Sequence, residues 1–400
     1  MVEGWNYSLL SSVCEEITSG GAAPQGDKYF INGRYSFVRV VDMGNLQGKK
    51  LMSQTRDMIN DDGAVKLRLF PKGTILFTKS GASLLLNQRA ILNEPMFIVS
   101  HIGCLIPNEN VISDWLYYWM KTVDFNVYAH ATTLPSLKLT TIKGLTIPVP
   151  PIPEQERIVA RIEELFSQLD AGVETLKKTK AQLTVYRQAV LKEAFESVIS
   201  ESTTCNVDDV CKDIKVGIVI KPAQYYTSAD IGVRAFRSAN VREFAVNDSD
   251  WVYLTKAGHE ANLRSEIHTG DVLVVRSGYP GTACVVPPAY NGCNAIDILI
   301  AVPDVEKILP EYLCAYTNSP LGRKIVQEKK RGVAQAHFNV SGYSKTPIIV
   351  PCMEKQKRVI TEIDARLSEC DSIEKTVDTA LQQAEAMRQS ILKDAFEGKM

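Results

Sequence analysis

The sequence has no long hydrophobic run, no paired cysteines and no excess of charge of one sign. No stretch of 18 or more apolar residues occurs in the 400 residues, so we expect no transmembrane helix. The first residues, Met1-Val2-Glu3-Gly4-Trp5, lack a basic region followed by an apolar run, so we expect no secretory signal. Nine scattered cysteines form no C-x-x-C pair, which favours free thiols in the cytoplasm over a disulfide framework or a zinc site.

Motifs of several enzyme classes are also missing. The sequence has no P-loop, no G-x-S-x-G around Ser80 or Ser277, and no H-x-H or H-x-x-x-H spacing among its five histidines. Pro287-Pro288-Ala289-Tyr290 departs from the [ND]-P-P-[YF] motif of adenine methyltransferases, and we interpret it as a turn. We therefore predict no catalytic residue, no metal and no cofactor in this chain, although missing motifs do not exclude an unfamiliar enzyme.

The net charge of −1 bears on any interaction with nucleic acid. Residues 1–150 hold 14 basic and 12 acidic residues, and residues 206–350 hold 16 and 15, giving +2 and +1. Residues 151–205 hold 7 and 9, and residues 351–400 hold 8 and 10, giving −2 each. Strong non-specific attraction to DNA is therefore not expected from this chain alone. A DNA-binding role would need basic residues gathered on one face, or a partner that supplies most phosphate contacts.

An internal repeat is the strongest signal in the sequence. Residues 150–196 align without a gap with residues 351–397, and 15 of the 47 pairs are identical. The best match joins the segment Leu191–Glu196 to Leu392–Glu397. A period near 200 residues is too long for a solenoid repeat, so it indicates a duplicated unit of one domain and one helix.

Each copy contains a long helical pattern with an apolar residue every seventh position. We predict that the two helices form a coiled coil whose main seam contains Ile162, Leu169, Leu176, Leu183 and Val190 from one helix and Ile363, Val377, Ala384 and Ile391, with Cys370, from the other. A weaker second seam position is expected at Ile158, Leu165, Gly172, Thr179 and Tyr186, and at Val359, Arg366, Ile373, Ala380 and Met387.

Two seams of equal length in one chain favour each other as partners. Antiparallel pairing would place the two preceding domains at opposite ends of the coiled coil. The alternative is that each helix packs separately on its own domain.

The two large segments resemble each other less closely. Lys72–Gly81 matches Thr269–Gly278, and Val38-Arg39 with Asn45 is aligned with Val233-Arg234 and Asn240. Between these matches lie β-rich runs with glycine, asparagine and proline turns. We therefore predict an α+β fold with two α+β domains separated by an antiparallel coiled coil of two long helices, related by a pseudo-twofold internal repeat. The expected boundaries are 1–150 and 201–350 for the two domains and 151–200 and 351–400 for the two helices.

This order of elements, together with several local motifs, resembles the specificity subunit of type I restriction–modification systems over nearly the whole chain. The most specific motif is Ile147–Ile158, which is similar to the family's junction I-P-[LV]-P-P-x-x-E-Q-x-x-I. Weaker matches are Gly4-Trp5, Ile17–Pro24, and the G-D-[IV]-L strand at Gly73–Leu76 and Gly270–Leu273. The second junction, Val350–Val359, has fewer prolines, and the second domain's opening, Val216–Pro222, lacks the double glycine.

The resemblance implies a non-catalytic subunit that reads double-stranded DNA. Each recognition domain would read one half of a split target, and the helices would set the spacing and dock two modification (methyltransferase) subunits. Those partners would bind S-adenosylmethionine and methylate adenine, and motor–nuclease restriction subunits would complete the enzyme. No membrane partner is expected. The alternatives are a coiled-coil scaffold for protein assembly only and a fused restriction–modification enzyme, which the missing methyltransferase motif opposes.

Arginine pairs with guanine, and asparagine or glutamine with adenine, so DNA contacts are expected in polar loops beside the matched strands. The alternative for each such residue is an ordinary solvated side chain. The candidates in the first domain are Gln25, Lys28, Arg34, Tyr35, Arg39, Lys79, Ser80 and Arg89. Those in the second domain are Tyr225, Tyr226, Arg234, Arg237, Arg276, Ser277, Tyr279, Lys329, Lys330 and Arg331.

Overall fold

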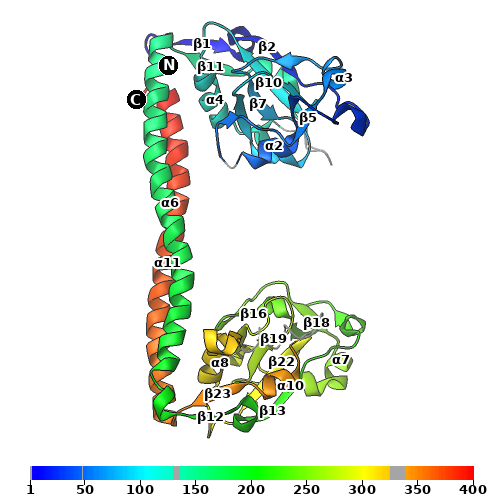
Figure 1. The fold of residues 1–400 in the computed structure, drawn as a ribbon, viewed down its shortest axis with the longest axis vertical. Helices are drawn as coiled ribbons and strands as arrows, with labels where there is room; N and C mark the ends of the chain where they lie inside the picture. The colour runs from blue at the N-terminus through cyan, green and yellow to red at the C-terminus, as the bar shows by residue number, and fades with distance from the viewer. Residues whose placement is uncertain (1, 47, 129–135, 325–337) are drawn as a thin grey trace. The chain divides into compact units, whose positions relative to one another are not determined.

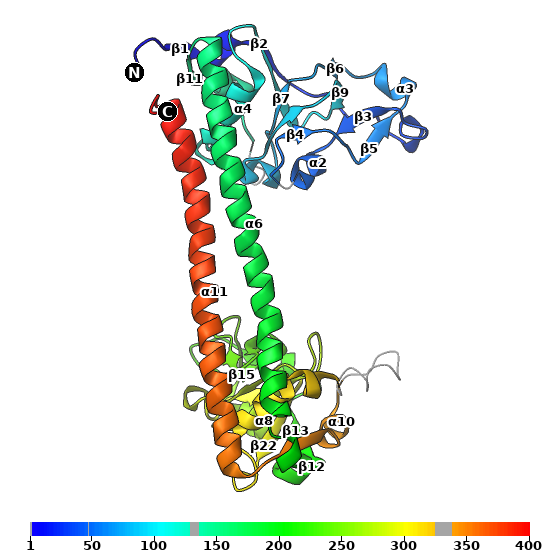
Figure 2. The same ribbon diagram turned by 60° about the vertical axis from the view of Figure 1, so that its left-hand side comes forward.

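The computed structural model describes residues 2–46, 48–128, 136–324 and 338–400. The chain forms two compact units. The first unit comprises Met1–Leu176 and Thr379–Met400, and the second comprises Lys177–Asp378. Each contains one α+β domain and parts of both long helices, α6 (Ile152–Glu196) and α11 (Met353–Phe396) (Figures 1 and 2). The predicted α+β class is confirmed. The predicted domain boundaries stay a prediction.

The domain of the first unit is built on two sheets and a strand pair. The five-stranded sheet has the order β2 (Cys14–Ser19), β10 (Ile102–Pro107), β7 (Ile75–Thr78), β8 (Arg89–Leu92), β4 (Leu51–Met52). The four-stranded sheet has the order β5 (Asp57–Ile59), β3 (Tyr35–Val38), β9 (Met96–Ile98), β6 (Leu69–Phe70), and β1 (Asn6–Leu9) pairs with β11 (Thr146–Val149). The helices are α1 (Leu10–Val13), α2 (Val40–Asn45), α3 (Asp61–Ala64), α4 (Ser113–Thr122) and α5 (Leu139–Lys143), with short 3-10 turns at Asp27–Tyr29, Ala82–Leu86 and Phe125–Val127.

The domain of the second unit has the same plan. One sheet has the order β13 (Cys211–Val216), β22 (Ile298–Pro303), β19 (Val272–Val275), β20 (Ala283–Val285), and another has the order β14 (Tyr226–Thr227), β18 (Val252–Leu254), β15 (Val233–Phe236), β21 (Asn294–Ala295). Two strand pairs join β12 (Thr203–Asn206) to β23 (Pro347–Val350) and β16 (Val241–Arg242) to β17 (Ala245–Val246). The helices are α7 (Lys256–Ala261), α8 (Pro310–Asn318) and α10 (Val340–Ser344), and 3-10 turns occur at Ile199–Glu201, Val207–Val210, Pro222–Tyr225, Ser238–Asn240, Leu263–Ser265 and Pro288–Tyr290.

The ends of the long helices are part of each domain's core. In the first unit Trp115 of α4 is fully buried, and its ring lies 4.5 Å from that of Phe396 near the end of α11. In the second unit the ring of Phe195, near the end of α6, lies 5.2 Å from those of Tyr312 and Tyr316 on α8. The matched segments at the two helix ends therefore insert an equivalent phenylalanine, Phe195 or Phe396, into each domain's core, and we call these two residues the plugs. This equivalence explains the sequence similarity of the two segments.

The two long helices run antiparallel in each unit. In the first unit Arg388 forms an ion pair with Asp170. In the second unit Arg187 lies 2.6 Å from Asp371, and Lys180 lies 2.7 Å from Asp378. The two arginines occupy equivalent positions of the repeat, as do Asp170 and Asp371. The duplicated helix thus makes the same ion pair twice, which requires antiparallel pairing in a fixed register.

The residues predicted for the main seam are all buried or half-buried in the helix pair. The predicted second seam position is wrong for Gly172, Tyr186, Ile373 and Met387, which are exposed. The other six residues predicted for it are buried or half-buried. The residues that lie four positions after each main position, not three, are all buried or half-buried, and four of these ten are charged. Those residues are Phe166, Val173, Lys180, Arg187 and Ala194 on α6, and Leu367, Glu374, Leu381, Arg388 and Ala395 on α11.

One predicted alignment between the two domains is also wrong. Val38 ends β3 and pairs with Ile98, and Phe236 ends β15 and pairs with Ala295. The structural equivalent of Arg39 is therefore Arg237, three residues beyond the aligned Arg234. The backbone confirms this, because the side chains of Asp42 and Asn240 each accept a hydrogen bond from the arginine N–H three residues earlier.

The missing second glycine in the second domain's opening has a simple explanation. A Cβ atom on Gly20 would lie 2.1 Å from the carbonyl oxygen of Ile98, and one on Gly217 would lie 2.2 Å from that of Ala295. Only this first glycine of each opening sits under a neighbouring strand's backbone in both domains. The local difference therefore leaves the fold unchanged.

A search of the helices in the described ranges found none with the length and apolar character that a membrane span requires.

Candidate nucleic-acid interface

Four of the first domain's candidates are exposed, and two of these share one carboxylate. Gln25 and Lys28 lie in the loop before β3. Arg34 forms an ion pair with Asp61, and the hydroxyl of Tyr35 donates to the same carboxylate at 3.0 Å. The structure therefore brings Arg34 and Tyr35 together on the surface, and the carboxylate of Asp61 in the same domain partly neutralises the arginine charge.

Arg39 and its equivalent Arg237 hold the second sheet in place. Arg39 pairs with Asp57, and its guanidinium carbon lies 5.2 Å from the ring of Phe30 and 5.3 Å from that of Phe37. Arg237 donates to the carbonyl oxygen of Asp250. Both side chains are half-buried, so these contacts account for the two arginines as structural ties of the loop that follows each strand.

Arg89 is a correction, because the structure places it in the interior. It is 4% exposed, and its guanidinium donates to the carbonyl oxygens of Gln88 at 3.0 Å and Val123 at 3.2 Å. The guanidinium carbon also lies 3.7 Å from the ring centre of Phe125. Burial lowers the pKa of Arg89 to about 9. We therefore assign Arg89 to the domain's core packing and withdraw it as a DNA contact.

A basic cluster on the first domain was missed by the sequence reasoning. Lys66 donates to the hydroxyl of Tyr29 at 2.6 Å, and the ammonium group of Lys28 lies 5.0 Å from the centre of the same ring. The hydrogen bond from Lys66 lowers the pKa of Tyr29. Two cations around one half-buried tyrosine form a suitable contact for a DNA phosphate. The 37 residues between the two lysines hid this arrangement in the sequence.

Equivalent turns in the two domains carry different polar pairs. Lys79 and Ser80 follow β7, and the Ser80 hydroxyl lies 2.8 Å from Nδ1 of His101, just before β10. Arg276 and Ser277 follow β19, and Arg276 lies 2.6 Å from Asp297, just before β22. Arg276 also donates to the carbonyl oxygen of Phe338 at 3.1 Å. Lys79 is equivalent to Arg276 and Ser80 to Ser277, so the two turns carry similar residues. The difference lies in the side chain before the next strand, His101 or Asp297, and in the turn residue that it contacts.

The remaining candidates of the second domain differ in accessibility. Tyr226 and Arg234 are exposed, and the Arg234 guanidinium carbon lies 5.7 Å from the ring centre of Trp251. Tyr225 is half-buried beside Gly258 of α7, while Tyr279 is 86% exposed. Lys329, Lys330 and Arg331 lie outside the described residues.

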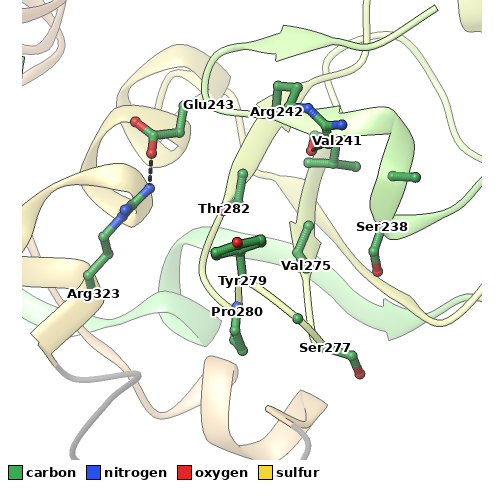
Figure 3. Close-up of a pocket in the computed structure, with 12 residues that line it drawn as sticks. Ser238, Val241, Arg242, Glu243, Val275, Ser277, Tyr279, Pro280, Thr282 and Arg323 are labelled. Carbon is green, nitrogen blue, oxygen red and sulfur yellow. Dashed lines mark hydrogen bonds and ion pairs between the residues drawn. The ribbon is translucent and has the colours of Figure 1, made fainter. Parts of the chain in front are cut away.

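A cavity of about 720 Å³ lies next to the Ser277–Pro280 turn of the second domain. Figure 3 shows Arg323 and Glu243 joined on one side and Ser238 and Ser277 on the other, with Tyr279 between them. The guanidinium groups of Arg242 and Arg323, which line this cavity, can donate hydrogen bonds to a bound group, and part of the cavity wall is apolar. The cavity is lined by Ser238, Ala239, Val241, Arg242, Glu243, Val275, Ser277, Gly278, Tyr279, Pro280, Thr282 and Arg323.

Sequence comparisons point to one family. Residues 2–185 match the model of the type I restriction modification DNA specificity domain. The chain is 22% identical over 426 residues to the EcoKI specificity subunit of Escherichia coli K12, and the match covers 100% of this chain and 89% of that protein. It is 28% identical over 228 residues to the MjaIX specificity subunit of Methanocaldococcus jannaschii, covering 54% of this chain and 50% of that protein.

Solved structures show the same fold. A chain from a structure of a type I restriction–modification system, described for its complex assembly and conformational transition, matches with a TM-score of 0.80 at 16% identity, covering 100% of this chain and 99% of that chain. The HsdS subunit from Thermoanaerobacter tengcongensis matches with a TM-score of 0.58 at 16% identity, covering 100% and 98%. The repeated domain-and-helix plan, the match to the family model over residues 2–185 and these relatives agree, and the chain is similar to type I restriction–modification specificity subunits over its whole length.

Proposed function

We propose that this chain is the non-catalytic DNA reader of a type I restriction–modification complex. Each α+β domain reads one half of a bipartite target in double-stranded DNA. The paired helices set the spacing between the halves and dock two modification subunits, which bind S-adenosylmethionine and methylate the DNA. Motor–nuclease restriction subunits join this assembly in the cytoplasm.

The observation that carries the proposal is one frame with two different reading surfaces. The Ser80–His101 and Arg276–Asp297 pairs occupy equivalent turns but offer different hydrogen-bonding groups. Tyr279 is exposed on the second domain's turn, whereas the first domain continues there into a 3-10 turn at Ala82–Leu86. Because sequence is read by side chains at base edges, two such surfaces suit two unlike half-sites.

Within each domain we assign different tasks to different exposed or half-buried groups. Lys28 and Lys66, around Tyr29, would contact phosphates and fix the position of the first domain. Lys79 and Ser80 in the first domain, and Arg234, Ser277 and Tyr279 in the second, are the candidates for reading bases. The cavity beside Tyr279 would accept part of the second half-site.

Methylome sequencing tests this proposal directly. The chain is expressed together with a candidate modification subunit, an adenine methyltransferase from the same genome, in a host that lacks other adenine methylation. We expect methylation at one split motif whose two constant blocks flank a spacer of fixed length. Exchanging residues 201–350 for the equivalent domain of a relative should change one block and leave the other. A single contiguous motif, or two changed blocks, would contradict the proposal.

The second candidate is a scaffold that uses its helices for protein assembly only. The net charge of −1 favours it, because DNA-binding proteins usually carry a basic surface. The same experiment separates the two functions. A scaffold would co-purify with its partners, yet the methylation pattern would not change when a domain is exchanged.

A further inference from the structure

A buried glutamine ties the first domain to the start of α6. Gln155 is fully buried in the first turn of the helix. Its side-chain oxygen accepts a hydrogen bond from the N–H of Ile112 at 3.0 Å, directly before α4. Its amide donates to the carbonyl oxygens of Asn110 at 2.9 Å and Pro150 at 2.8 Å. One side chain thus joins the start of α4 to the start of the long helix.

The second unit repeats this joint at Gln356, which is also fully buried. Its side-chain oxygen accepts from the N–H of Leu309 at 2.9 Å, directly before α8. Its amide donates to the carbonyl oxygens of Lys307 at 2.9 Å and Pro351 at 3.0 Å. Gln155 and Gln356 are an identical pair of the repeat, so the agreement extends from the residue type to all three partners.

We propose that Gln155 and Gln356 are positioning residues that fix the orientation of each recognition domain on its helix, and thereby determine how strictly the protein discriminates between spacer lengths. The inference rests on the proposed function, because it needs two half-sites at a defined separation. A small rotation at either joint would move the reading surface along the duplex, so a loose joint would accept neighbouring spacers.

Glutamine is suited to this task because one planar amide offers two donors and an acceptor at fixed angles. All three partners of each glutamine are backbone groups, so its hydrogen bonds fix the position of the main chain directly. A methionine of similar length would fill the space but leave one N–H and two carbonyl groups without a partner. Losing buried hydrogen bonds of this kind is costly, and the joint would relax to satisfy them.

The test measures binding of the complete complex with its modification subunits to duplexes of different spacer length. The variants Gln155→Met and Gln356→Met are compared with the natural protein on the preferred spacer and on spacers one and two base pairs longer or shorter. We expect the preference for the correct spacer to fall about tenfold, equivalent to about 1.4 kcal/mol. Discrimination against a base change within either half-site should stay the same.

Gln182→Met and Gln383→Met are the matched controls. These glutamines are also an identical pair of the repeat, but both are exposed on the long helices. The ratio of affinities between spacers should not change in either control, whatever happens to affinity itself. Gln155→Glu and Gln356→Glu keep the shape and the accepting oxygen but can donate at most one of the two bonds, and only when the carboxyl group is protonated. They give the same reading if a methionine variant does not fold.

The possible outcomes distinguish a failure of the role proposed for the glutamines from a failure of the proposed function. An equal loss of affinity for every spacer, with the ratio unchanged, would overturn the role of the glutamines and leave the proposed function standing. An absence of any spacer preference in the natural complex would overturn the proposed function itself.

Discussion

The two domain–helix joints share their glutamine but differ in their charges. In the first unit Lys50 lies 2.5 Å from Asp114 and also contacts Glu163 on α6. In the second unit the equivalent acids are Glu311, directly before Tyr312, and Asp364 on α11. Burial and the charge of Glu311 raise the pKa of Asp364. No cation pairs with these two acids in the described part of the chain.

This difference indicates which features of the joint are needed for its geometry. Buried hydrogen bonds to backbone fix direction, and both joints keep them. Surface ion pairs contribute little and depend weakly on direction, so one copy can lack the cation. The apolar plugs at the helix ends, Phe195 and Phe396, are again shared.

The largest expected effect comes from removing the plugs. Phe195→Ala should destabilise the second unit by about 3 kcal/mol, because the ring is fully buried among aromatic neighbours. Phe396→Ala should destabilise the first unit by about half as much, since that ring is only half-buried. Hydrogen exchange, measured separately for the sheets of each unit during denaturant unfolding, gives both values. Equal losses in both units from either variant would contradict the assignment of one plug to each unit.

Removing Lys50 should make the first joint resemble the second. Lys50→Met leaves Asp114 and Glu163 facing each other, and we expect the first unit to lose about 1 kcal/mol of unfolding free energy at low salt. Burial lowers the pKa of Lys50, but the hydrogen bonds to Asp114 and Glu163 and the attraction of their charges together outweigh it, so the pKa is raised, in line with the stabilising role of this lysine. High salt should reduce the loss, because it screens the repulsion. A loss that does not depend on salt would point to packing of the aliphatic stem instead.

The smallest expected effect has the opposite sign. Asp364→Asn removes one of two facing acids and should stabilise the second unit by a few tenths of a kcal/mol at neutral pH, since solvent screens the pair. Because the pKa of Asp364 is raised in the folded state, the folded protein binds this proton more tightly than the unfolded protein does. The free energy of unfolding of the natural protein should therefore rise as the pH falls towards the ordinary carboxyl range. The variant should lack that part of the pH dependence. Thermal unfolding between pH 7 and about 4 measures it, and an unchanged profile would show that the repulsion is negligible.

The sequence predicted the duplicated plan because repeats and heptads are local patterns that survive in one dimension. It located the main seam but not the residues four positions after it, since Lys180 and Arg187 there are charged and make ion pairs across the helices. It could not foresee that Arg89 is buried, because that depends on Phe125 and Val123 lying beside it in the fold. The Lys28 and Lys66 cluster depends on long-range packing in the same way. The shared glutamine was visible as an identity, but its three backbone partners were not.

The proposed function requires that the paired helices determine the separation between the two half-sites. Deleting one matched heptad from each helix, Thr175–Ala181 and Val377–Gln383, keeps the antiparallel register and removes about 10 Å of helix. In the complete complex, we expect the preferred spacer to shorten by about three base pairs, with both half-site sequences unchanged. Selection from duplexes with random spacer lengths measures this preference. A preferred spacer of the natural length would contradict this requirement.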